Sequence, residues 1–126
     1  MNLRSIDSPR RRPAPTEARL ERLNGECLTQ TLSPRTLIVA VKDNCDGCRA
    51  FVEEPLAGLD EWELLLVSRD RLAGALREVY LAPALLAELE ISSAPFFVAL
   101  DGAPLHVVHE GVVFAPEQVA NELSSH

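Results

Sequence analysis

The feature that most constrains the fold is a six-residue apolar run followed closely by a pair of cysteines. Residues 36–41 read Thr-Leu-Ile-Val-Ala-Val, and a polar turn separates them from Cys45-Asp46-Gly47-Cys48. A continuous apolar run without alternation is typical of a strand that is covered on both faces of its sheet. Residues 49–59 then carry apolar side chains at helical spacing. A doubly buried strand with a helix directly behind it predicts an α/β domain.

Further elements are expected along the rest of the chain. Strands are predicted over 62–68, 96–100 and 105–113, with an Asp101-Gly102 turn between the last two. Helices are predicted over 83–89 and 116–123, each with a proline at its start. The pattern of 69–82 fits either a helix or an irregular connection. Near the N-terminus, Thr16 as a cap and a short apolar stripe predict a helix that ends near Asn24–Gly25. Strands spaced by helices predict parallel crossovers, and the closing hairpin adds an antiparallel edge.

Length and charge limit the organisation and the function classes. The 126 residues suffice for one core. Residues 1–15 are expected to be a disordered basic tail and 16–126 a single domain. Charge is +3 over residues 1–22 and −10 over the remainder, which disfavours nucleic-acid binding by the domain. No apolar run approaches the roughly 20 residues of a membrane span, and no signal-peptide pattern is present. A cytosolic location is expected, where paired cysteines indicate redox work or metal binding.

The position of the cysteine pair favours redox chemistry. Backbone N–H groups and the helix dipole stabilise a thiolate at a helix start. A separation of three residues in a helix brings the second sulfur close enough to bond the first. Cys45 is therefore the expected nucleophile, and Cys48 the thiol that resolves the mixed disulfide. Asn44, directly before the motif, is expected to cap the helix or to contact substrate.

Over about residues 36–123 the chain resembles the thioredoxin-like superfamily. The resemblance rests on the strand, Cys45-x-x-Cys48 and helix, on Ser93-Ala94-Pro95 before a strand, and on the Asp101-Gly102 turn before the last strand and helix. It implies a central mixed β-sheet flanked by helices. It also implies that the peptide bond before Pro95 is cis, and that the backbone of Ala94 pairs with an incoming peptide beside the dithiol.

The chain departs from thioredoxin at three positions. The Trp-Cys-Gly-Pro-Cys motif is here Asn44-Cys45-Asp46-Gly47-Cys48, without the aromatic residue and the proline. Val39 stands where a buried carboxylate assists proton transfer from the second cysteine. These departures support a second hypothesis, in which the fold is a binding module or a slow redox sensor.

A zinc-binding protein is the third hypothesis, because His106 and His109 with Cys45 and Cys48 make four potential ligands. Residues three apart on a strand point to opposite faces, so surface histidines are favoured. Cys27 is interpreted as a partly buried, small apolar residue.

The first hypothesis is a thiol–disulfide oxidoreductase that acts as a reductase. Its catalytic residues are Cys45 and Cys48, and its substrate-binding residues are Asn44, Ala94 and Pro95. No metal or organic cofactor is expected. The expected partners are a disulfide-containing protein or small molecule and a reductase or small thiol as electron donor, with neither nucleic acid nor membrane. Oligomeric state is left open.

Overall fold

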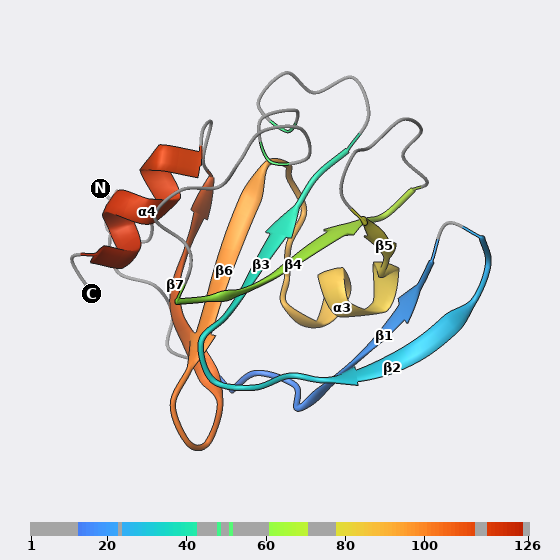
Figure 1. Ribbon diagram of the computed structural model, residues 1–126, viewed down its shortest axis with the longest axis horizontal. Coiled ribbons are helices and arrows are strands. Elements are labelled where there is room, and N and C mark those ends of the chain that lie inside the picture. The colour runs from blue at the N-terminus through green and yellow to red at the C-terminus, as the bar shows by residue number, and fades with distance from the viewer. Residues whose placement is uncertain are drawn as a thin grey trace.

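A computed structural model of the protein describes residues 13–22, 24–42, 48, 51, 61–70, 78–112 and 116–124. Within these ranges seven strands form one sheet, in the order β2-β1-β5-β4-β3-β6-β7, together with two helices (Figure 1). The elements are β1 (Glu17–Glu21), β2 (Cys27–Thr31), β3 (Thr36–Ala40), β4 (Glu63–Ser68), β5 (Tyr80–Leu81), α3 (Pro83–Glu88), β6 (Phe96–Asp101), β7 (His106–Val112) and α4 (Pro116–Ser124).

The centre of the sheet is the apolar run identified in the sequence. All five residues of β3 are buried. This strand pairs in parallel with β4 and antiparallel with β6, so the sheet is mixed, as expected. Its one polar side chain, Thr36, donates a hydrogen bond from Oγ1 to the Ser33 carbonyl at 2.7 Å, which satisfies the buried hydroxyl.

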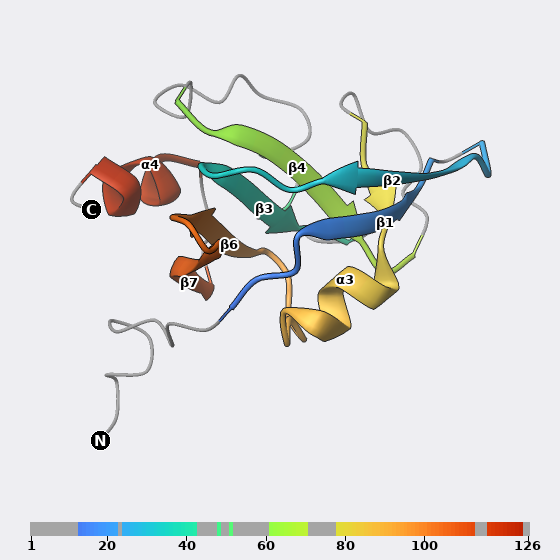
Figure 2. The same cartoon turned by 90° about the horizontal axis from the view of Figure 1, so that it is seen from below.

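The sheet has an apolar core on each face, because side chains alternate along its strands. We call them the first core and the second core. The first core consists of Leu37, Val39, Val41, Cys48, Phe51, Trp62, Leu66, Val79, Phe97, Ala99, Val108, Val119 and Leu123. The second core consists of Ala18, Leu20, Leu32, Ile38, Ala40, Leu65, Val67, Ala82, Leu85, Leu86, Leu89, Ile91, Val98, Leu100, Leu105 and Val107. Helix α4 contributes to the first core and α3 to the second, and Figure 2 shows the two helices apart from each other on either side of the sheet.

The N-terminal segment differs from the expected helix over 16–25. It forms the antiparallel hairpin β1–β2, with Leu20 opposite Leu28. Ala18 and Leu20 alternate with exposed neighbours and enter the second core, so the apolar period here is two rather than 3.6. Gly25, expected as a helix stop, lies in the hairpin connection with φ at 94°. This short segment forms strands because packing buries its alternating apolar face in the second core.

A β-bulge in β7 overturns the expected placement of the two histidines. His106 pairs with Asp101 and His109 pairs with Ala99, while the register shifts between Ala99 and Leu100. Asp101 and Ala99 are two residues apart on β6, so both histidines lie on the same face of the sheet. The expectation of opposite faces is wrong, because Val108 is an extra residue within the strand.

The remaining elements largely follow the expectations. The strands expected over 62–68, 96–100 and 105–113 are β4, β6 and β7, and the helices expected at Pro83 and Pro116 are α3 and α4. Of the helix expected over 49–59, the described residue Phe51 is helical. The segment 69–82, for which the sequence left a helix and an irregular connection open, contains β5. Its residues 71–77 lie outside the described ranges. No helix in the described ranges is long and apolar enough to span a membrane.

The end of the expected basic tail lies against the domain. Of residues 1–15, the structure describes 13–15. Pro13 forms an isolated bridge with His106, and the Ala14 N–H donates to the Leu105 carbonyl at 3.0 Å. The boundary between residues 15 and 16 stays a prediction.

Candidate redox site

The sheet brings the segment before the cysteine motif next to the Ala94-Pro95 pair. Ala40, the last residue of β3, is opposite Phe96, the first residue of β6. Pro95 therefore lies beside the point where the chain leaves β3 toward the cysteines. The Ala94–Pro95 peptide bond is cis, which confirms the expectation from the sequence. Pro95 is buried, and the partly buried Ala94 packs against the first core.

Cys48 belongs to that same first core. It is helical, its exposed fraction is 2%, and its sulfur is in a disulfide bond. Within the described part of the site, Cys48 and Ala94 share the first core, and Pro95 follows Ala94 directly in the chain. The other two residues expected from the sequence, Asn44 and Cys45, lie outside the described ranges.

The interior next to Cys48 is apolar. Val39 is fully buried in the first core, and none of the described residues of that core carries a charge. An acidic group on the core side of Cys48 is therefore absent from the described part of the molecule. Among the described residues, therefore, no buried carboxylate is present to accept a proton from the Cys48 thiol.

A cleft of about 200 Å³ opens beside the cis-proline and was not expected from the sequence. It lies where β3 and β4 end and where the chain from α3 approaches β6 (Figure 1). Its lining consists of Ala40, Val41, Lys42, Ser68, Arg69, Asp70, Leu86, Ile91, Ser92, Ser93 and Ala94. These residues come from four separate segments, and only the sheet order brings them together. Polar residues directly behind buried strands, such as Lys42 and Arg69, were the sequence signal available.

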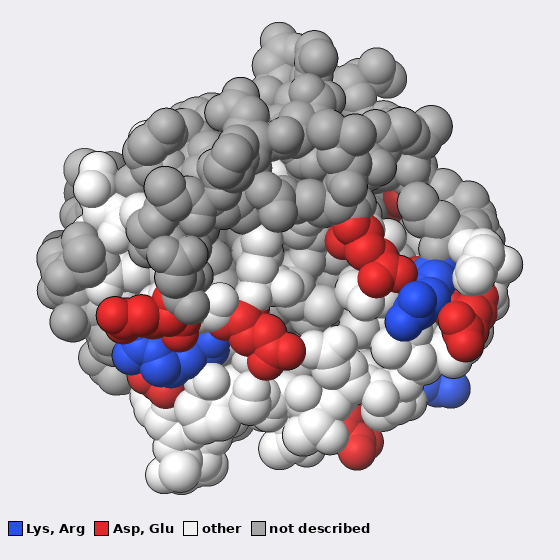
Figure 3. Space-filling model, viewed as in Figure 1, with Lys and Arg blue, Asp and Glu red and all other residues white. Residues whose placement is uncertain are grey.

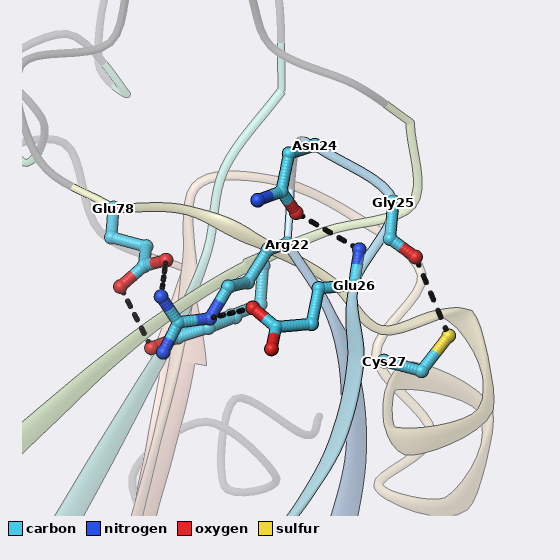
Figure 4. Close-up of polar contacts among 7 residues, drawn as sticks. Arg22, Asn24, Gly25, Glu26, Cys27 and Glu78 are labelled. Atoms are coloured by element: carbon cyan, nitrogen blue, oxygen red, sulfur yellow. Dashed lines mark hydrogen bonds and ion pairs between the residues drawn. The ribbon is translucent and has the colours of Figure 1, made fainter.

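Cys27 lies away from this site. It is an exposed free thiol in the edge strand β2, so its interpretation as partly buried is wrong. Its neighbours are shown in Figure 4: Cys27 Sγ lies 3.8 Å from the Gly25 carbonyl, and Arg22 forms ion pairs with Glu26 and Glu78 at 3.5 Å each. Cys27 is exposed because β2 lies at the edge of the sheet, and that position cannot be read from the residue type alone.

Three of the candidate ligands of the zinc hypothesis, Cys48, His106 and His109, are described, and Cys45 lies outside the described ranges. No three His, Cys, Asp or Glu side chains among the described residues lie close enough to hold one metal ion. His106 Nδ1 instead contacts the Pro104 carbonyl at 3.0 Å.

Two solved structures share this architecture. No protein-family model and no curated protein matches the sequence. A proposed protein disulfide isomerase from Bacteroides thetaiotaomicron superposes with a TM-score of 0.61 at 15% identity, covering 90% of this chain and 84% of that one. The MTB protein DsbF, solved in its mixed oxidized and reduced forms, superposes with a TM-score of 0.58 at 12% identity, covering 89% of this chain and 98% of that one. At such identities the likeness establishes the fold.

Proposed function

Because this chain has the thioredoxin-like fold, we propose that it is a thiol–disulfide oxidoreductase whose exchanging pair is Cys45 and Cys48. One observation carries the proposal: Cys48 is disulfide-bonded, helical and buried in the same core against which Ala94 of the cis-proline segment packs. Cys27 is a free thiol, so Cys45 is the proposed partner of Cys48. Both neighbours in fold have names drawn from disulfide chemistry.

The proposed cycle transfers two electrons from the dithiol to a substrate disulfide. The Cys45 thiolate attacks one substrate sulfur, so a mixed disulfide forms and the other substrate sulfur leaves as a thiolate that takes a proton. Cys48, deprotonated toward solvent, then attacks the Cys45 sulfur of the mixed disulfide. The Cys45–Cys48 bond forms, and the second substrate thiol is released. A small thiol or a reductase restores the dithiol, and the proposed cytosolic location favours reduction of the substrate.

The proposal is tested by disulfide exchange of three variants. Cys45→Ser should abolish catalytic turnover of a small aromatic disulfide, because the attacking sulfur of the exchanging pair is lost. Cys48→Ser should accumulate a mixed disulfide that mass spectrometry detects, because the resolving sulfur is lost. Cys27→Ser, a matched control at an exposed free thiol, should keep wild-type rates. Full activity of the Cys45→Ser protein would overturn the proposal.

The reduction potential and the exchange rate together separate this function from a second candidate. The apolar surroundings of Cys48, with Val39 in place of a carboxylate, favour slow exchange and hence a redox-sensing or binding module. Equilibration in glutathione buffers should give a two-electron midpoint of about −180 to −270 mV for an exchange catalyst. Such a midpoint with exchange no faster than that of an unfolded dithiol would favour the sensing module instead.

A further inference from the structure

The cleft beside the cis-proline is placed to contact whatever reaches the cysteine pair. It extends from Ala94, which precedes the cis-proline, to Arg69 and Asp70 behind β4. We propose that this cleft binds an acidic, extended segment of a substrate peptide next to the substrate's cysteine. The inference rests on the proposed function and specifies the substrate class for that site.

The size and floor of the cleft fit a peptide rather than a whole small-molecule cofactor. Sites for small molecules have volumes of about 300 to 1,000 Å³, and this cleft has about 200 Å³. Its floor includes the buried apolar residues Ala40, Leu86 and Ile91. An extended peptide places alternate side chains on one side, so it can seat one aliphatic side chain on this floor while its neighbours face the rim.

The rim supplies charges that favour an acidic segment. Lys42 and Arg69 are exposed, and neither forms an ion pair within the described part of the chain. Among the described lining residues Asp70 is the one acidic side chain, so these residues carry a net charge of +1, whereas the chain carries −7. Arg22 and Arg35 differ from these two cations, because Arg22 pairs with Glu26 and Arg35 pairs with Glu61. On the face shown in Figure 3, the two larger blue patches adjoin red ones, whereas a small blue patch at the lower right borders white residues.

Ser92 and Ser93 add hydroxyl groups to the same rim. Both are exposed and lie directly before Ala94. A hydroxyl donates a hydrogen bond to a carboxylate as well as to a peptide carbonyl. The segment that is proposed to pair with the substrate backbone is therefore continuous with donors for an acidic side chain.

The test compares two peptides that differ in one charged residue. Each carries a single cysteine in a mixed disulfide with a chromophoric thiol, next to either Leu-Glu or Leu-Lys. Release of the chromophore by the pre-reduced Cys27→Ser protein, which lacks the exposed free thiol, gives a second-order rate constant for each peptide in a single turnover. An exposed charge contact changes such a constant by a factor of about 1.4 to 5. Since Lys replaces an attractive contact by a repulsive one, the Glu peptide should react about 2 to 25 times faster at low salt. The ratio should fall toward one in 1 M salt, where charges are screened within about 3 Å.

Three variants assign the preference to the rim. Arg69→Gln should lower the ratio of the two rate constants, and Asp70→Asn should raise it, because these changes have opposite signs of charge. Arg19→Gln, at an exposed arginine on β1, is the matched control and should leave the ratio unchanged. We choose Arg69 rather than Lys42 for substitution because Lys42 lies only three residues before Cys45 in the sequence. Loss of the Lys42 charge would also change the reactivity of the Cys45 thiolate.

The two proposals fail in different ways. Equal rates for both peptides would overturn the acidic subsite and leave the oxidoreductase intact. Absence of release from either peptide would overturn the oxidoreductase. In that case, peptides with serine in place of cysteine decide the subsite by NMR titration of the Ser92 and Ser93 amides. Tighter binding of the Glu peptide that Arg69→Gln removes would support the subsite, and equal binding would overturn it.

Discussion

Tyr80 shows how the surroundings of one side chain set its titration. Its hydroxyl donates a hydrogen bond to Glu78 Oε1 at 2.9 Å. Partial burial raises the pKa of Tyr80 above the ordinary value of 10.0, and the hydrogen bond and negative charge of Glu78 raise it further, while Arg22 opposes them. The neutral phenol is thus the form that the folded protein favours.

The pH dependence follows from this sign. Since the folded-state pKa lies above the unfolded value, the contribution of Tyr80 to stability is fully present below pH 10 and is lost as the pH rises through the folded pKa. The chain has one tyrosine, so phenolate absorbance reports Tyr80 alone. The midpoint should lie above that of the urea-unfolded chain, and Glu78→Gln should lower it. Identical midpoints for the folded and unfolded chains would contradict this assignment.

The properties of individual residues were predictable to different degrees. The helical position of Cys48 and the cis bond before Pro95 were predictable because each lies in a local sequence pattern next to a strand. The exposure of Cys27 and the clustering around Arg69 were not, since both depend on which strands become neighbours. Local sequence patterns predict the secondary structure and chemistry of a residue, whereas the order of strands in the sheet determines its neighbours and its exposure.

At the level of elements, the hairpin β1–β2 is where sequence periodicity was least informative. Its five-residue strands are too short to distinguish a period of two from a period of 3.6. The strands β3 and β4 were assigned correctly because their apolar runs are uninterrupted. The helices α3 and α4 were assigned correctly because each begins with a proline. The two residues of β5 carry no pattern at all.

The connection of this hairpin depends on one glycine. Gly25 has a φ of 94°, a region that side chains with a Cβ avoid, although no atom lies within 4 Å of a Cβ built there. Gly25→Ala should therefore destabilise the fold by about 1 kcal/mol through the backbone alone. Urea unfolding of the reduced proteins measures the change.

Gly111→Ala provides the matched control for that experiment. Gly111 has no positive φ, and a Cβ there would lie 3.7 Å from the Phe97 ring, which is ordinary van der Waals contact. Its substitution should change the unfolding free energy by less than about 0.5 kcal/mol. An equal loss in both variants would show that the conformation of Gly25 does not carry the cost.

At the scale of the whole molecule, one sheet serves both cores, so the two faces should unfold together. Trp62 is the single tryptophan of the chain, has an exposed fraction of 8% and belongs to the first core. The Arg35 guanidinium covers its ring at 4.8 Å from the centroid. Its fluorescence therefore reports one face of the sheet.

A substitution on the opposite face tests this coupling. Leu85 of α3 is buried in the second core, and Leu85→Ala should cost about 2 to 5 kcal/mol. Trp62 fluorescence and far-UV circular dichroism should show the same shifted urea midpoint. Ala87→Ser, at an exposed position of the same helix, should leave both midpoints in place. Separate midpoints for the two probes would show that the faces unfold independently.

The bulge in β7 has a consequence for how the length of this chain changes in evolution. The pairs on either side of Val108 remain in register when that residue is passed over, since Val107 faces Leu100 and His109 faces Ala99. Loss of Val108 would therefore shorten the strand without turning any later side chain to the other face, whereas a deletion two residues further on would invert the end of the strand. Homologues of different length should place their insertions and deletions at this kink, and nowhere else in the β6–β7 pair.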